Sequence, residues 1–251
     1  MTDDKQLIEH WFKIQSKELQ RNAQIVTKEQ AGIQYHIDKN TPSQFVPRMP
    51  RSAFDDENAT TPRFTTAPSI LGCMIGYSSY RYLDEFINGY AVGTADKKDE
   101  YRGGYEISEI DYSYAIKPNK KLISECDRTD ELWLVSYSKS TIAYRPKKIG
   151  KMFIHQVVFT NKDHVQNSAG ICESYVIYLH HESESDLHLT DKLTVPAGYW
   201  KITVEWKSPS EPDVHEENQI RVEKISQSDW TKAKVGKAAM LSHIEKPWMS
   251  W

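Results

Sequence analysis

Short runs rich in β-branched and aromatic residues fill the chain from residue 105 onward, and they limit the folds that are open to it. Such runs, bounded by glycine, proline or polar residues, are typical of β-strands. Pro196-Ala197-Gly198 is a turn sequence between two of them, with glycine where a turn requires positive φ. The strands predicted in this part of the chain are residues 105–114, 132–137, 141–144, 152–159, 174–180, 187–195 and 199–206.

Helical patterns occur mainly near the two ends of the chain. Apolar residues spaced by three and four, among them Leu7, Trp11 and Ile14, predict a helix from residue 3 to about residue 30. This helix either packs on the core or binds a partner. Pro68-Ser69 begins a second helix, and Ser228-Asp229 caps a third that reaches about residue 245. Strands and helices together predict an α+β fold.

The charges and the cysteines exclude several classes of protein. With 32 basic and 35 acidic residues the net charge is -3, which argues against binding nucleic acid through overall charge. The N-terminus is acidic where a signal peptide needs basic residues, and no stretch approaches the roughly 18 apolar residues of a membrane span. Cys73, Cys126 and Cys172 form no CxxC pair, which disfavours a disulfide framework or a zinc knuckle. We therefore expect a cytoplasmic protein with no membrane partner.

Common catalytic signatures are absent from the sequence. It has no GxSxG, P-loop or GxGxxG motif, so hydrolase, NTPase and Rossmann interpretations lack support. His180-His181 and His188 have no helical spacing that would set a metal geometry, and we expect no metal site. Cys73 lies in an apolar helix, where a thiol is a buried packing residue more often than a nucleophile. The lysines and tryptophans of residues 230–251 leave two interpretations open, a nucleic-acid contact or a terminal helix docked on the body.

Three features in chain order suggest a different chemistry. Tyr35-His36-Ile37 is a strand with a central histidine. The run Arg63-Phe64-Thr65-Thr66-Ala67-Pro68-Ser69 leads from a strand into a helix that carries Tyr77 and Tyr80. Glu131 then heads the strongly β-forming run Leu-Trp-Leu-Val. In this order the sequence resembles the ADP-ribosyltransferase fold in its histidine–tyrosine–glutamate form, over about residues 33–160.

The resemblance implies an organisation in three segments. An N-terminal helix at residues 1–30 precedes a split β core at residues 31–160, which is similar to an ADP-ribosyltransferase. A β-rich appendage with a terminal helix follows at residues 161–251, and the resemblance says nothing about its role.

The resemblance also implies the roles of individual residues. Glu131 is the expected catalytic acid, His36 holds the ribose of NAD, and either Tyr77 or Tyr80 stacks on nicotinamide. Arginine forks suit a diphosphate because they donate two parallel hydrogen bonds. The expected NAD-binding set is completed by Arg48, Arg63 and Ser69.

These residue types suit the cleavage of NAD. Breaking the nicotinamide–ribose bond develops positive charge on the sugar, and a nearby carboxylate stabilises that charge. An imidazole can hydrogen-bond a ribose hydroxyl without becoming charged. The resemblance therefore implies an NAD-dependent ADP-ribosyltransferase or an NAD glycohydrolase that acts on an unidentified macromolecule, of the kind found among toxins, effectors and phage modifiers.

One departure from the family concerns the acceptor of ADP-ribose. Members that modify arginine commonly carry Glu-x-Glu, whereas Thr129 stands two residues before Glu131 here. Arginine is therefore in doubt, and nucleic acid, another side chain or water stays open as the acceptor. The alternative function is a non-catalytic module that binds protein or nucleic acid on an ADP-ribosyltransferase-like scaffold.

Overall fold

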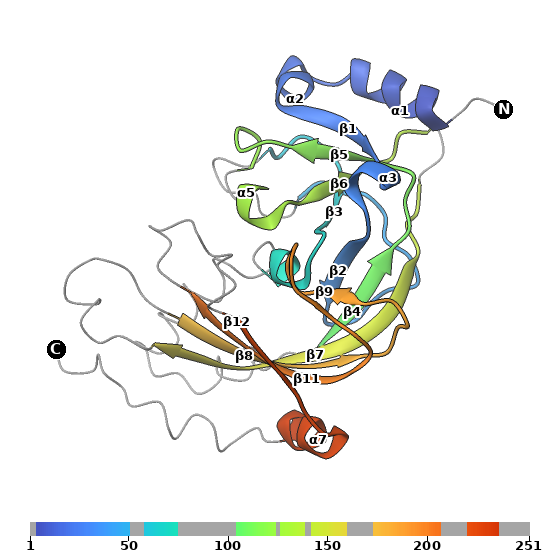
Figure 1. Ribbon diagram of the computed structural model, residues 1–251. Coiled ribbons are helices and arrows are strands. Elements are labelled where there is room, and N and C mark those ends of the chain that lie inside the picture. The colour runs from blue at the N-terminus through green and yellow to red at the C-terminus, as the bar shows by residue number, and fades with distance from the viewer. Residues whose placement is uncertain are drawn as a thin grey trace, which may run out of the picture. The chain divides into compact units, whose positions relative to one another are not determined.

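The protein is mostly β. The computed structural model describes residues 4–50, 58–74, 104–123, 126–138, 142–159, 173–206 and 220–235 (Figure 1). Three sheets are present in this part of the chain, with 41% of the described residues in strands and 23% in helices. The α+β class predicted from the sequence is therefore wrong, because the helices are few and short.

The chain forms two compact units that are built from interleaved segments. Unit 1 comprises Met1–Tyr77, Ile107–Lys148 and His188–Lys192, and unit 2 comprises Ser78–Glu106, Ile149–Leu187 and Leu193–Trp251. The contiguous division expected from the sequence, with boundaries near residues 30 and 160, stays a prediction.

The N-terminal segment is not one long helix. It consists of α1 (Asp4–Lys13), α2 (Lys17–Asn22), strand β1 (Ala23–Thr27) and α3 (Lys28–Ala31). The Ser16 hydroxyl caps α2 by accepting a hydrogen bond from the Leu19 N–H at 3.2 Å. The β-branched pair Ile25 and Val26 lies in β1, which pairs antiparallel with β5 (Tyr114–Pro118). The prediction of helix to about residue 30 was wrong here because strand pairing outweighs the helical spacing of the apolar residues.

A four-stranded sheet of order β1-β5-β6-β3 forms the centre of unit 1. Strands β3 (Phe64–Thr66) and β6 (Leu132–Leu134) pair antiparallel, as do β5 and β6. Successive residues of a strand point to opposite faces. Accordingly Leu132 and Leu134 join one buried cluster, whereas Trp133 and Val135 join a second one. The second cluster includes Ile8 and Leu19 of α1 and α2, the helices that lie along β1 in Figure 1, so both faces of the sheet are covered.

The largest sheet has six strands in the order β12-β11-β8-β7-β4-β2. The predicted turn before β11 is confirmed, since Gly198 has φ of 142°. The strands are β2 (Gln34–Asp38), β4 (Gly104–Ile110), β7 (Pro146–Phe159), β8 (Glu173–His181), β11 (Gly198–Trp206) and β12 (Ile220–Lys224), with β9 (Leu187–His188) and β10 (Thr194–Val195) in a separate two-stranded sheet.

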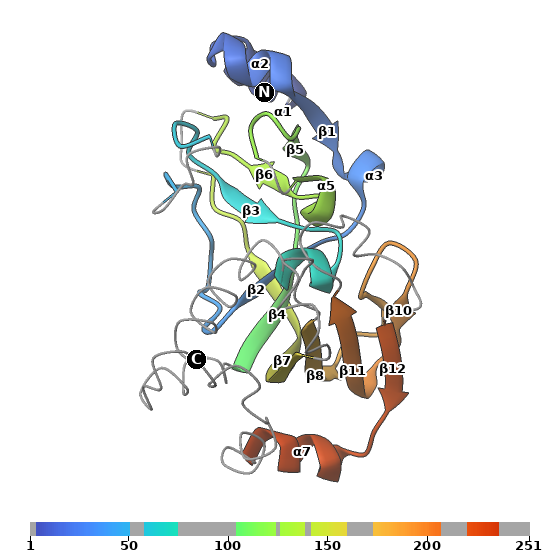
Figure 2. The ribbon, with the colours of Figure 1, turned by 90° about the vertical axis from the view of Figure 1, so that its left-hand side faces the viewer.

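Helix α7 (Gln227–Val235) follows β12 in unit 2 (Figure 2). Its Trp230 ring lies 5.3 Å from Phe153, 5.4 Å from His180 and 5.7 Å from Tyr199, measured between ring centroids. The described part of the terminal segment therefore packs on the sheet. This agrees with one of the two interpretations from the sequence, a terminal helix docked on the body. Within the described ranges, no helix combines the length and the apolar composition needed to cross a bilayer.

Removing buried apolar volume from the centre of unit 1 should destabilise the fold strongly. Ile116 of β5 is 0% exposed and pairs with Trp133 of β6. We expect Ile116→Ala to lower the free energy of unfolding by about 2–5 kcal/mol, because it loses buried methyl groups and leaves a cavity. Ile14 is 66% exposed, and Ile14→Ala should change the same quantity by less than about 0.5 kcal/mol. Urea denaturation measures both, and equal losses would contradict the assigned core.

Candidate functional site

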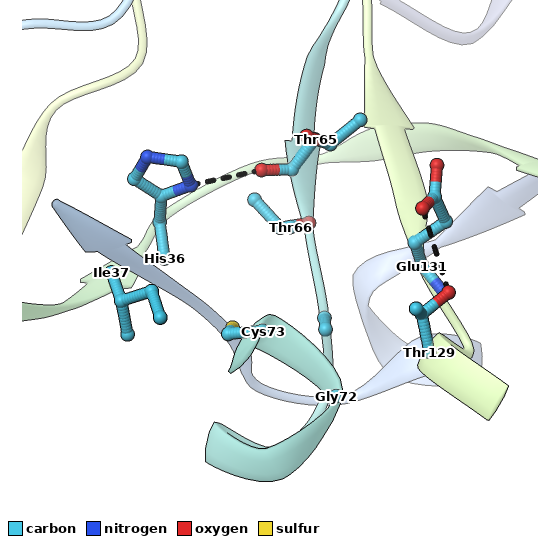
Figure 3. A pocket seen from close by; sticks show the side chains of 9 residues that line it. His36, Ile37, Thr65, Thr66, Gly72, Cys73, Thr129 and Glu131 are labelled. Atoms are coloured by element: carbon cyan, nitrogen blue, oxygen red, sulfur yellow. Dashed lines mark hydrogen bonds between the residues drawn. The ribbon is translucent and has the colours of Figure 1, made fainter. Parts of the chain in front are cut away.

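A pocket of about 80 Å³ lies in unit 1, between β2, β3, the helix that begins at residue 70 and the start of β6 (Figure 3). Two residues that the sequence analysis selected, His36 and Glu131, both line it although they are far apart in the chain. The other lining residues are Ile37, Thr65, Thr66, Ala67, Gly72, Cys73 and Thr129.

The imidazole of His36 is held as a neutral ring. It packs against Phe45 and Phe64, which stack on each other, and the centroid of its ring lies 4.8 and 4.5 Å from theirs. Burial lowers the pKa of His36 to about 4, so the ring is neutral at pH 7. Nδ1 lies 3.0 Å from the carbonyl oxygen of Thr65, the bond drawn in Figure 3. Because a carbonyl only accepts, Nδ1 carries the hydrogen and Nε2 is left as an acceptor.

A tight backbone turn places Glu131 at the start of β6. Asp130 directly follows helix α5 (Cys126–Thr129), and its φ of 48° lies in the left-handed region. The Asp130 N–H donates to the carbonyl of Cys126 at 2.8 Å, and the Asp130 carboxylate lies 2.7 Å from the Lys117 ammonium. The Glu131 N–H then donates to Thr129 Oγ1 at 3.3 Å. The hydrogen bonds of these two backbone N–H groups fix the segment that carries Glu131.

The carboxylate of Glu131 is mostly buried and receives a hydrogen bond from an indole. Glu131 is 9% exposed, and its Oε1 accepts from Nε1 of Trp133 at 2.7 Å. The Thr129 hydroxyl is 3.5 Å from Oε2. A buried carboxylate needs such donors, because burial without them costs several kcal/mol.

The wall opposite Glu131 contains Gly72 and Cys73 of the helix that begins at residue 70. A Cβ at Gly72 would lie 2.7 Å from the carbonyl oxygen of Thr129, so only glycine allows this approach. The Cys73 thiol donates to the carbonyl of Tyr35 at 3.2 Å, and burial raises its pKa to about 12. The Cys73 thiol is therefore protonated at pH 7, which disfavours a role as a nucleophile.

Three further residues of the expected NAD-binding set, Arg48, Arg63 and Ser69, do not line the pocket. The Arg63 guanidinium is 4.2 Å from the ring centroid of Trp133 and donates to the carbonyls of Asn58 and Thr61. Arg48 pairs with Arg63 through the backbone, and neither lines the pocket. The hydroxyl of Ser69 accepts from the Gly72 N–H at 3.1 Å, so Ser69 caps the helix. Tyr77 and Tyr80 lie outside the described residues.

Sequence reasoning did not select the hydroxyl groups that line the pocket. Thr65 and Thr66 belong to the motif that suggested the family, but their positions in a strand gave no sign that they border a cavity. The available signal was the spacing of two between Glu131 and Trp133, which is typical of residues that share one face of a strand; Thr129 lies in α5 and gave no such signal.

Comparison of the chain with family models, with curated proteins and with solved structures gave no match. No group of three potential metal ligands occurs in the part of the chain that the structure describes.

The neutral state of His36 makes stability depend on pH. Between pH 6.5, the ordinary pKa of the ring, and the folded value of about 4, the unfolded chain binds a proton that the folded chain does not. The free energy of unfolding should therefore fall by about 1.4 kcal/mol for each unit of decreasing pH in this window. In His36→Asn this contribution should disappear. Denaturation at several pH values measures it, and His10→Asn, which removes an exposed imidazole from α1, should keep it. An unchanged pH dependence in His36→Asn would contradict the neutral ring.

Proposed function

We propose that this protein cleaves NAD at the nicotinamide–ribose bond and transfers ADP-ribose to a macromolecule or to water. The observation that carries the proposal is that His36 and Glu131, the pair selected by the family resemblance, line one pocket. Their side chains come from β2 and from the start of β6, so the pairing depends on the fold and not on sequence proximity.

The pocket suits the ribose part of NAD. Its described lining has one carboxylate, the hydroxyls of Thr65, Thr66 and Thr129, and an imidazole that is neutral at pH 7. No lysine or arginine is among these lining residues, so the pocket does not suit the diphosphate. A sugar that gains positive charge is stabilised by a carboxylate, and hydroxyl groups can bind its own hydroxyls.

The proposed reaction is a nucleophilic substitution at C1′ of the ribose. The C1′–nitrogen bond breaks and its electron pair leaves with nicotinamide, which neutralises the charge of the ring. A bond forms between C1′ and the oxygen or nitrogen of the acceptor, whose proton is released. Glu131 stabilises the oxocarbenium-like transition state. His36 donates through Nδ1 to Thr65, and its Nε2 accepts a hydrogen bond from a ribose hydroxyl.

The acceptor follows from the residue two positions before Glu131. Thr129 supplies a hydroxyl there, whereas family members that modify arginine carry a second acid. We therefore propose an acceptor other than arginine: nucleic acid, another side chain or water. We also propose that the protein acts in the cytoplasm, as expected from the sequence. Its substrate there would be NAD, and it would need no membrane partner.

A second function, binding without catalysis, is favoured by a specific observation. The described pocket measures about 80 Å³, whereas small-molecule sites typically measure about 300–1,000 Å³. In this case the Glu131–Trp133 hydrogen bond would serve the stability of β6, and the protein would bind protein or nucleic acid through its surface. Release of nicotinamide from NAD distinguishes the two functions.

Removal of the negative charge at Glu131 should abolish turnover without unfolding the protein. Glu131→Gln keeps an oxygen that can accept from Trp133 Nε1, but it no longer stabilises positive charge on the ribose. We expect nicotinamide release to fall by about 10²–10³-fold or more, the scale on which a preorganised electrostatic group acts. The measurement is the rate of nicotinamide release by wild type and variant with matched melting temperatures.

Asp130→Asn is the matched control for this experiment. Asp130 is the neighbouring acid, it is exposed, and it does not line the pocket. Asparagine also tolerates the positive φ of this position. The control should keep the wild-type rate. Equal rates for wild type and Glu131→Gln would refute the role of Glu131, and no release by wild type would refute NAD cleavage.

A further inference from the structure

We propose that Trp133 is a positioning residue that holds the Glu131 carboxylate in its reactive orientation, and that Arg63 holds the indole of Trp133 in turn. This inference rests on the proposed NAD cleavage, because only a reacting carboxylate needs a fixed direction. It assigns a role to two side chains that do not line the pocket.

The hydrogen bond joins Trp133 of β6 to Glu131, the residue directly before this strand. Residues spaced by two share a face, so the indole and the carboxylate lie side by side. Nε1 of Trp133 donates to Oε1 of Glu131 at 2.7 Å, the short distance typical of a bond to a charged acceptor. Trp133 is 0% exposed, so water does not compete for this N–H.

Arg63 fixes the plane of the indole. Its guanidinium lies 4.2 Å from the ring centroid, in the range of a cation–π contact. One nitrogen of the same guanidinium donates to the carbonyls of Asn58 and Thr61, so Arg63 cannot turn away without losing these bonds. Arg63 is itself 5% exposed. The guanidinium, the indole and the carboxylate therefore form a rigid series that ends at the pocket.

A fixed carboxylate has a direct consequence for catalysis. Groups that already point toward the developing charge stabilise the transition state without reorganising during the reaction. Without the indole N–H, the Glu131 carboxylate would lose one donor and turn more freely. Substrate binding would change little, because Trp133 does not line the pocket. Loss of Trp133 Nε1 should therefore act on kcat and not on KM.

Kinetics of Trp133→Phe test this role. Phenylalanine keeps an aromatic ring beneath Arg63 but lacks the N–H. We expect kcat for nicotinamide release to fall by about tenfold or more, the effect of one lost hydrogen bond to a charged group, while KM for NAD stays within about twofold. Trp11→Phe is the matched control, because Trp11 packs against the same buried cluster as Trp133. This variant also removes an indole N–H, but not the one that Glu131 accepts. It should keep the wild-type kcat.

A spectrum tests the hydrogen bond separately from activity and from any instability of the variants. The chain has 7 tryptophans, and ¹H–¹⁵N spectra resolve their indole N–H signals. The signal that is missing in Trp133→Phe identifies Trp133. In wild type it should lie downfield, and in Glu131→Gln it should move upfield while the other signals stay in place.

The outcomes separate this inference from the proposed function. A wild-type protein that releases no nicotinamide would overturn both. Active wild type with unchanged kcat in Trp133→Phe would overturn the positioning role alone, as would an indole signal that does not respond to Glu131→Gln. A fall of kcat at constant KM, together with the shifted indole signal, supports it.

Discussion

Strand β6 is buried on both of its faces, and the candidate site depends on this burial. Leu132 and Leu134 pack into one cluster and Trp133 into the other, so a shift of one residue would move each of these side chains into the opposite cluster, where it does not fit. The same alternation sets the face on which Glu131 lies. The register that packs the core of unit 1 is therefore also the register that brings a carboxylate beside an indole and to the edge of the pocket.

Local patterns in the sequence predicted part of this arrangement. The strands at residues 64–66 and 132–134 and the turn at Gly198 follow from β-branched, aromatic and glycine residues, which act locally. Strand β1 was missed because its apolar residues continue the helical spacing of the preceding segment, and only pairing with β5 decides the conformation. The order of the motifs led us to expect His36 and Glu131 in one site. That Thr65 and Thr129 also line this pocket could not be predicted, because it depends on how distant segments of the chain pack together.

Arg63 shows why residue type alone does not identify a ligand. An arginine beside a family motif suggests a diphosphate contact, since the guanidinium fork matches phosphate oxygens. The same fork also matches backbone carbonyls, and its flat face stacks on an indole. A buried arginine makes the internal contacts, whereas an exposed one is open to a ligand. Whether the side chain is buried depends on which residues the fold packs against it.

The left-handed backbone at Asp130 limits what this position accepts. Asparagine, aspartate and glycine adopt positive φ more readily than other residues, and β-branched residues do so least. In a library randomised at position 130, selection for folding alone should enrich these three residues. Among these three residues, only aspartate retains the ion pair with Lys117. The library would therefore distinguish selection for positive φ from selection for the ion pair. The residue before Glu131 is thus open to sequence change only within a narrow stereochemical class.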